Sequence, residues 1–219
     1  FEKHKNADFI IDNMIFELKE LQEEGLDKLE RRRKISNLFS PYYSSSEAIY
    51  IDPSILSEFD RKKYFAFLSS PIEKKVKDAF EQVEATNNRL SNKYRLGLIY
   101  LNSGYLSLPH EDFNAEVRRY VNKNNLNFDE VVTLSASGQT DGFNLYVISR
   151  FDPEVPTLDE TIKLRESWFK NMNDIMSKLV RGELTHLSNP QKPISFNHSG
   201  IDFYWLPYAI ERFNFETKS

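Results

Sequence analysis

The fold prediction starts from the stretch Ala7-Asp8-Phe9-Ile10-Ile11-Asp12-Asn13-Met14-Ile15-Phe16-Glu17-Leu18-Lys19. Two short apolar runs of β-prone residues flank Asp12-Asn13, a pair that tolerates left-handed backbone angles. This pattern predicts a β-hairpin with a two-residue turn. In such a hairpin Asp8 lies opposite Glu17, so two carboxylates meet side by side.

The predicted hairpin has a definite register because its turn holds two residues. Counted outward from the turn, the opposed pairs are Ile11 with Met14, Ile10 with Ile15, Phe9 with Phe16, and Asp8 with Glu17. Side chains alternate along a strand, so Asp8, Glu17 and Lys19 share one face, together with Asn6, Ile10 and Ile15. Phe9, Phe16 and Leu18 point the other way, into a core.

Paired carboxylates on one face suggest a metal site. Like charges directly opposite each other destabilise a sheet unless something compensates them, and a divalent cation would do so. Mg²⁺ takes oxygen ligands, usually one or two carboxylates together with water and substrate phosphate. Lys19, two residues beyond Glu17, could orient a metal-bound water or neutralise charge on a phosphate. Together these residues outline a phosphodiester-cleaving site.

The segments Ala7-Asp8-Phe9 and Ile15-Phe16-Glu17-Leu18-Lys19 resemble the two motifs of the restriction-endonuclease-like PD-(D/E)xK nuclease superfamily, with alanine in place of the usual proline. The resemblance implies a Mg²⁺- or Mn²⁺-dependent endonuclease that hydrolyses DNA, with Asp8 and Glu17 as metal ligands and Lys19 assisting the water nucleophile. In such families a preceding helix often supplies one more acidic ligand, for which Glu2 is the candidate. The superfamily serves restriction, phage defence, mobile elements and repair, and these residues do not choose among them.

Two alternatives remain open. The motif is short, so the hairpin could be an ordinary sheet edge with a Glu17–Lys19 ladder on its surface. The whole chain could then be a non-catalytic nucleic-acid-binding or scaffold protein of the same fold, assembling through its aromatic C-terminal region. In a nuclease the two carboxylates would converge in an open cleft, whereas in a scaffold they would splay into solvent or be capped by cations.

Composition sets wider limits. The chain has 219 residues, 40% of them hydrophobic, with 17 Phe and 11 Tyr, which is typical of a folded, aromatic-rich globule. It has no cysteine, which removes disulfides and fits a cytoplasmic location. No apolar run is long enough to span a membrane, so we expect no membrane partner. The net charge of −4 leaves nucleic acid as a partner only through a local basic surface.

The order of predicted elements indicates an α/β protein with a mixed central β-sheet flanked by helices, which resembles the core of the restriction-endonuclease-like superfamily. We expect helices over 20–37, 55–67, 71–90 and 111–124, and strands over 94–101, 128–136 and 143–149. The second of these strands should be parallel to the first and the third antiparallel to the second. The third strand of the core is either 48–52 or 94–101. Residues 1–150 would form this nuclease-like domain, with a helical insertion near 53–92.

A dense cationic run lies in the first predicted helix and comprises Lys28, Arg31, Arg32, Arg33 and Lys34. One interpretation is a solvated helix face paired with Glu23, Glu24 and Glu30. The other is a nucleic-acid-binding surface close to the metal site, where each cation would add salt-dependent affinity.

Residues 151–219 are predicted to form a helical, aromatic-rich C-terminal extension. Thr157 and Glu160 have the spacing of a capping box, which predicts a long helix from there to about Arg181. Its wide apolar face would pack on the sheet or on a partner subunit. Cutting both strands of DNA would favour a homodimer, and association with a larger assembly is equally open. The four histidines show no metal-ligand spacing.

Overall fold

The computed structural model describes residues 6–43, 48–91, 93–140, 144–186, 193–206, 210–212 and 215–217. The four α-helices of this part of the chain are α1 (Leu29–Phe39), α2 (Glu58–Arg89), α3 (His110–Lys123) and α4 (Asp159–Val180). Its strands are β1 (Phe9–Ile11), β2 (Met14–Leu21), β3 (Ala48–Tyr50), β4 (Arg95–Asn102), β5 (Glu130–Thr140), β6 (Leu145–Asp152), β7 (Leu184–His186), β8 (Ile194–His198), β9 (Ile201–Trp205), β10 (Ile210–Arg212) and β11 (Phe215–Thr217). None of these helices is long and apolar enough to cross a lipid bilayer.

The N-terminal hairpin forms in the predicted register. Strands β1 and β2 are antiparallel, with Phe9 opposite Phe16, Ile10 opposite Ile15 and Ile11 opposite Met14. Asp12 opens the two-residue turn with a φ of 48°, the left-handed region that Asp and Asn tolerate better than most residues. The turn chemistry therefore sets the register of the candidate site.

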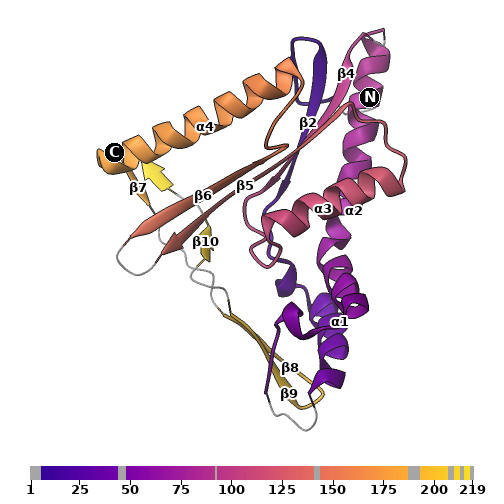
Figure 1. Cartoon of the computed structure of the whole chain (residues 1–219), viewed down its shortest axis with the longest axis vertical. Helices are drawn as coiled ribbons and strands as arrows, with labels where there is room; N and C mark the ends of the chain where they lie inside the picture. The colour runs from indigo at the N-terminus through magenta and orange to yellow at the C-terminus, as the bar shows by residue number, and fades with distance from the viewer. Residues whose placement is uncertain are drawn as a thin grey trace, which may run out of the picture.

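The main sheet is mixed and has the strand order β1-β2-β4-β5, with β6 and β10 both paired to β5 (Figure 1). Strand β4 is parallel to β2, and β5 is parallel to β4. Strand β6 runs antiparallel to β5. The predicted strand–helix–strand unit β4-α3-β5 and its antiparallel neighbour β6 are thus confirmed.

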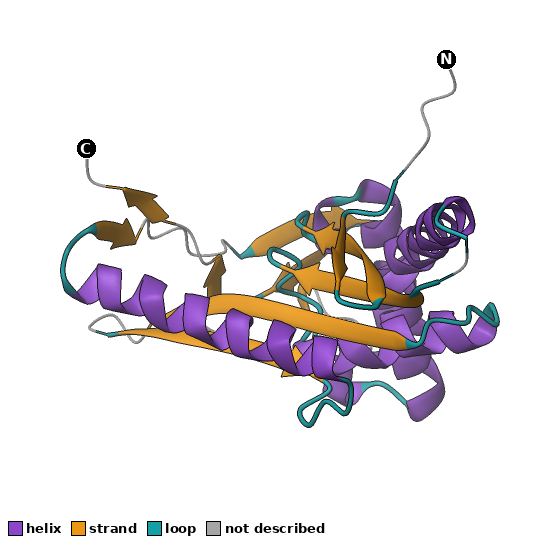
Figure 2. Ribbon diagram, turned by 90° about the horizontal axis from the view of Figure 1, so that it is seen from above, coloured by secondary structure: helices purple, strands orange, loops and turns teal. Residues whose placement is uncertain are grey.

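Helices cover both faces of this sheet (Figure 2). On one face, α1, α2 and α3 form the larger core with sheet residues such as Leu21, Leu98 and Tyr100. On the other face, Leu164 and Trp168 of α4 pack on a smaller core that includes Phe16 and its neighbours on β4, β5 and β6. Alternate residues of each central strand therefore enter different cores, as the pleat of a strand requires.

The connection between β2 and β4 differs from the prediction. The sequence predicts two helices separated at Pro71, but α2 is one helix with Pro71 inside it. A proline in a helix lacks the N–H that would bond to the carbonyl four residues earlier, here Phe67. Arg31 of α1 donates to that carbonyl from Nε at 2.9 Å and Ser70 Oγ donates to it at 3.2 Å, so the acceptor keeps partners where the helix continues.

Of the two candidates for the third strand, residues 94–101 are confirmed, because β4 lies next to β2 in the main sheet. Strand β3 joins a separate sheet of order β3-β9-β8, and β4 pairs with β2 in parallel after the crossover through α1 and α2. A parallel partner needs a long connection, which the helical segment supplies.

Within the described residues, the C-terminal extension is helical only in α4. After α4 the chain forms short strands: β8 and β9 build the small sheet with β3, and β10 returns to the main sheet beside β5. The predicted capping box is also wrong, since α4 begins at Asp159 and its cap residue is Leu158. Glu160 instead binds Arg95 of β4 through both carboxylate oxygens at 2.6 Å. Both in the strands after α4 and at the start of α4, contacts with distant parts of the chain determine the structure more than the local sequence pattern does.

Candidate functional site

The candidate site lies on the face of the hairpin that α2 covers. Lys19 of β2 donates from Nζ to Gln82 Oε1 of α2 at 2.6 Å. One turn further along α2, Thr86 Oγ1 accepts a hydrogen bond from Ala7 N, directly before Asp8, at 2.9 Å. Helix α2 thus holds the motif segments together, and α2 is placed there by the crossover from β2 to β4.

Glu17 is the buried member of the site, with 2% of its surface exposed. Its Oε1 lies 2.5 Å from Lys19 Nζ, whereas its Oε2 is buried and has no hydrogen-bond partner. Burial raises the pKa of the Glu17 carboxyl; the hydrogen bond and charge of Lys19 act against this shift, and the nearby charge of Asp8 adds to it. A buried carboxylate oxygen without a donor is costly, so it marks a place where a ligand is favoured.

Asp8 is exposed and lies directly before β1. Its Oδ2 accepts a hydrogen bond from Leu18 N of β2 at 2.8 Å. This contact holds the Asp8 carboxylate against β2 at Leu18, the residue directly after Glu17. The predicted neighbours Asp8, Glu17 and Lys19 are therefore brought together.

The donor set suits a hard divalent cation. Asp8, directly before β1, and Glu17 of β2 supply carboxylate oxygens, and Glu17 Oε2 is uncommitted. No group of three acidic, histidine or cysteine side chains is found among the residues that the structure describes, so these two carboxylates stand as a pair. The third predicted ligand, Glu2, lies outside the described residues. Two carboxylates with water and phosphate are sufficient for Mg²⁺.

The predicted cationic run divides into two kinds of residue. Arg31 and Arg32 bind protein carbonyls: Arg31 bonds to Gly25 O at 2.8 Å and Phe67 O at 2.9 Å, and Arg32 bonds to Leu26 O at 2.6 Å. Their guanidinium groups serve the fold. Lys28 and Lys34 form exposed ion pairs with Glu23 and Glu30, each at 2.7 Å, which contribute little to stability. Arg33 is exposed and has no ion-pair partner among the described residues.

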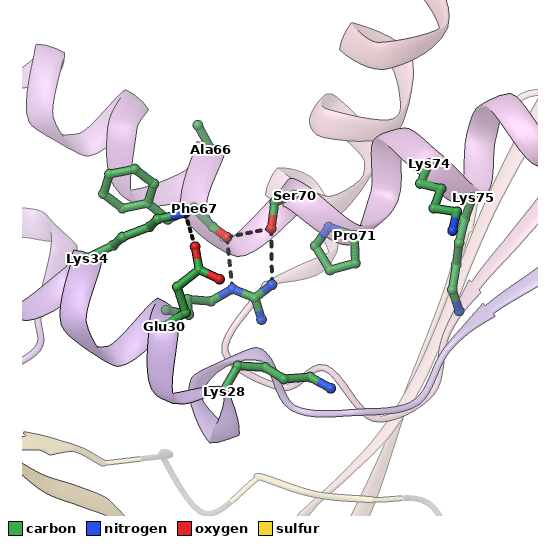
Figure 3. Close-up of a pocket in the computed structure, with 10 residues that line it drawn as sticks. Lys28, Glu30, Lys34, Ala66, Phe67, Ser70, Pro71, Lys74 and Lys75 are labelled. Carbon is green, nitrogen blue, oxygen red and sulfur yellow. Dashed lines mark hydrogen bonds and ion pairs between the residues drawn. The ribbon is translucent and has the colours of Figure 1, made fainter.

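A basic pocket of about 620 Å³ lies between α1 and α2 (Figure 3). Its lining holds Lys28, Arg31, Lys34, Lys74 and Lys75, and a single acidic residue, Glu30. Lys75 Nζ donates to Glu20 O, three residues beyond Glu17 on β2. At about 3.3 Å per strand residue, the pocket begins about 10 Å from Glu17 along β2.

Two contributions of α2 to this region are not evident in the sequence. One side of α2 is visibly basic, but nothing in the sequence shows that Lys74 and Lys75 face α1. Gln82 is not among the predicted site residues, although it lies seven residues after Lys75 and thus on nearly the same side of a helix. Only the packing of α2 on β2 shows that its amide meets Lys19.

The chain matches no protein-family model, no curated protein and no solved structure. Its function must therefore be inferred from the residues and their geometry.

Proposed function

We propose that this protein is a Mg²⁺-dependent nuclease that hydrolyses DNA phosphodiester bonds. The observation that carries the proposal is Glu17 Oε2, a buried carboxylate oxygen without a donor, on a side chain that pairs with Lys19 and feels the charge of Asp8, directly before the adjoining strand β1. A bound cation would satisfy this oxygen and offset the repulsion between the two carboxylates.

Each residue has a distinct role in this proposal. Asp8 and Glu17 hold the cation, and Mn²⁺ could replace Mg²⁺ on the same oxygen ligands. The metal, when bound, supplies charge to the scissile phosphate and lowers the pKa of a water. Lys19 neutralises charge that develops on the phosphate and orients the attacking water. Gln82 holds the Lys19 ammonium in place through its Oε1.

The basic pocket is the surface that we propose contacts the DNA backbone away from the cleaved bond. Lys28, Lys34 and Lys74 are drawn around the same pocket in Figure 3, and the pocket adjoins β2 through Lys75. Cations at such a surface contact phosphates without reading sequence, and they release counterions on binding. The phosphates of one strand are spaced about 3.4 Å apart along the axis of a DNA duplex, so a duplex whose axis followed β2 would reach the pocket about three base pairs from the cleaved bond.

A second candidate function is a non-catalytic nucleic-acid-binding or scaffold protein. The ion pair between Lys19 and Glu17 favours it, because a neighbouring cation already caps one oxygen of the carboxylate. In that case the pair stabilises the hairpin, and binding would depend on the basic pocket alone.

Cleavage of plasmid DNA with added Mg²⁺ or Mn²⁺ tests the proposal. We expect the wild-type protein to nick the plasmid, and Asp8→Asn, Glu17→Gln and Lys19→Met each to lower the rate about 10²-fold or more. Asp12→Asn is the matched control, because Asp12 is a carboxylate of the same hairpin that pairs with Lys163 of α4 instead. Its rate should equal that of the wild type.

Calorimetry with Mn²⁺ separates the two candidates. The nuclease binds the metal, and Glu17→Gln weakens binding without unfolding the protein, as circular dichroism would show. A folded wild-type protein that neither binds metal nor cuts DNA would establish the scaffold function instead.

A further inference from the structure

A hydrogen-bonded set of serine, histidine and aspartate lies on β5, α3 and β6, outside the candidate metal site. Ser135 Oγ is 2.9 Å from His110 Nδ1, and His110 Nε2 is 2.8 Å from Asp152 Oδ2. Ser135 and Asp152 are 25 and 42 positions from His110 in the chain, so the tertiary fold assembles the set. We propose that these side chains form a second catalytic site, a serine hydrolase site for esters of small acyl groups.

The hydrogen bonds define the roles of the histidine nitrogens. A carboxylate can only accept a hydrogen bond, so Asp152 fixes the proton of the neutral imidazole on Nε2. The Nδ1 lone pair then faces Ser135 and accepts its hydroxyl proton. This is the logic of a nucleophile, a base and a group that orients the base, recognised by geometry and not by order in the chain.

The sheet holds this set at an open position. Leu134 and Phe151 enter the small core under α4, so their neighbours Ser135 and Asp152 point to the opposite face, where α3 begins with His110. The His110 side chain is 8% exposed and that of Asp152 is 26% exposed. A cavity of about 170 Å³ is lined by both Ser135 and His110. This volume is below the range of about 300 Å³ and more for drug-sized ligands, and therefore suits a small acyl group.

A cation is available beside the serine. Arg150 of β6 lies directly opposite Ser135 in the β5–β6 ladder and lines the same cavity. Directly opposed residues have Cβ atoms about 5 Å apart, so the guanidinium can reach the space around Ser135 Oγ. Arg150 has no hydrogen-bond or ion-pair partner within the described part of the chain. It supplies the positive charge that stabilises the oxyanion of the reaction.

The loop before α3 is held by Asn102 of β4, which neighbours Ser135 in the parallel ladder. Its Nδ2 donates to Tyr105 O and Leu108 O, both at 3.1 Å, and its Oδ1 accepts from Tyr105 N at 2.9 Å. Asn102 thus acts as a positioning residue that keeps the start of α3 over β5. His198 offers a contrast: its Nε2 lies 3.1 Å from the amide oxygen of Asn37, and among the described residues no carboxylate is hydrogen-bonded to the ring.

The proposed reaction balances with water as the second reactant. Ser135 Oγ bonds to the acyl carbon, its proton passes to His110 Nδ1, and the bond from carbon to the leaving oxygen breaks. The proton then moves from Nδ1 to that oxygen, which leaves as an alcohol. Water, deprotonated by the same Nδ1, then adds its oxygen to the acyl carbon, and the bond from that carbon to Ser135 Oγ breaks. The carboxylic acid is released, and the proton on Nδ1 returns to Ser135 Oγ.

The test uses the full chain, p-nitrophenyl acetate and a fluorophosphonate probe. We expect a burst of p-nitrophenolate and, by peptide mass spectrometry, a phosphonyl adduct on Ser135. Ser135→Ala should abolish both signals. Asp152→Asn, which keeps the shape but loses the carboxylate, and Arg150→Gln should each slow acylation about 10²-fold or more.

Two controls make the outcome specific. Ser137→Ala removes a hydroxyl that lines the same cavity two residues further along β5, and it should leave labelling unchanged. Glu17→Gln and added chelator should also leave it unchanged, since this site needs no metal. A folded wild-type protein with no adduct on Ser135, or labelling of Asp152→Asn at the wild-type rate, would overturn the proposal.

Discussion

At the scale of the residue, Lys19 tunes the carboxylate on which the proposed metal site depends. The proposed cation would bind Glu17 only when its carboxyl is ionised, and burial raises the pKa of this carboxyl while Lys19 opposes that rise. Lys19→Met removes the opposing charge, so the pKa of Glu17 should rise further. We therefore expect Mn²⁺ affinity to decline at a higher pH in Lys19→Met than in the wild type, falling about tenfold for each pH unit below that pKa.

Isothermal titration calorimetry across the acid to neutral range measures this shift. The direction of the change in Mn²⁺ affinity tests this account. If Lys19 acted only by repelling the metal ion, Lys19→Met would bind Mn²⁺ more tightly than the wild type at every pH. Asp12→Asn again serves as the control and should leave the pH dependence where it is in the wild type.

Local chemistry made much of this site predictable. Asp12-Asn13 between two β-prone runs was sufficient to place Phe9 opposite Phe16, and hence Asp8 near Glu17. The local sequence pattern does not show how helix α2, which is distant in the chain, surrounds Glu17 and Lys19. Lys19 and its partner Gln82 are 63 residues apart in the chain, and only the packing of α2 on β2 joins them and buries Glu17 beside them.

At the scale of the element, α2 persists through Pro71 because Arg31 replaces the missing donor. The Phe67 carbonyl accepts from Arg31 Nε at 2.9 Å in place of a backbone N–H. Arg31→Met should therefore destabilise the protein by about 2 kcal/mol, because it removes a charged donor from Phe67 O and Gly25 O and leaves them only the longer bonds from Ser70 Oγ and Lys28 N, both at 3.2 Å. In a Pro71→Ala background, residue 71 regains an N–H for Phe67 O, and the cost should fall by about 1 kcal/mol.

Urea unfolding of the four proteins in this double-mutant cycle measures the coupling between residues 31 and 71. Arg32→Met is the matched control, since Arg32 donates to Leu26 O and has no contact with Pro71. Its cost should be the same in both backgrounds. Strictly additive effects of Arg31→Met and Pro71→Ala would show that Arg31 does not compensate for the proline.

The same helix shows why some elements could not be predicted from the sequence. Proline ends most helices, so splitting the segment at Pro71 followed the local rule, and the compensating guanidinium comes from another element. Likewise, β3 and β9 are short strands whose pairing joins residues 48–50 to residues 202–204. A three-residue strand is too short to show a hydrophobic periodicity. Strands β4 and β5 and helix α3 are long enough for their periodicity to predict the type of secondary structure.

At the scale of the whole molecule, the net charge is −4, but the pocket between α1 and α2 is locally basic. We expect Lys34→Gln with Lys74→Gln to weaken binding of a DNA duplex and to reduce the slope of log affinity against log salt by about 0.9 for each phosphate that the variant no longer neutralises. Lys62→Gln with Lys63→Gln is the control. These lysines lie in the first turns of α2, the helix that also carries Lys74, but outside the lining of the pocket, and they pair with Glu58 and Asp60.

Fluorescence anisotropy in chelator, so that no cleavage occurs, measures both pairs of variants over a range of salt. Equal slopes for the two double variants would place the DNA elsewhere on the surface. Because binding in chelator does not require the metal, this outcome is independent of whether Asp8 and Glu17 cut the strand.

The two cores on opposite faces of one sheet raise the question of how cooperatively the molecule unfolds. The chain has two tryptophans: Trp168 of α4 packs against the small core, and Trp205 of β9 packs against the large one. Strand β9 is tied to β3, and α4 is tied to β6 by a bond from Trp168 Nε1 to Ser149 Oγ at 2.7 Å. Since β2, β4 and β5 contribute side chains to both cores, loss of one core should expose the other.

Trp168→Phe and Trp205→Phe leave a single fluorophore on each face. After correction for the stability of each variant by circular dichroism, the fluorescence midpoints in urea should coincide with the loss of helix in both proteins, as two-state unfolding requires. An earlier transition for Trp205 alone would mean that the β3-β9-β8 sheet separates first. The large core, with the basic pocket beside it, would then open while the hairpin that carries Glu17 stays folded.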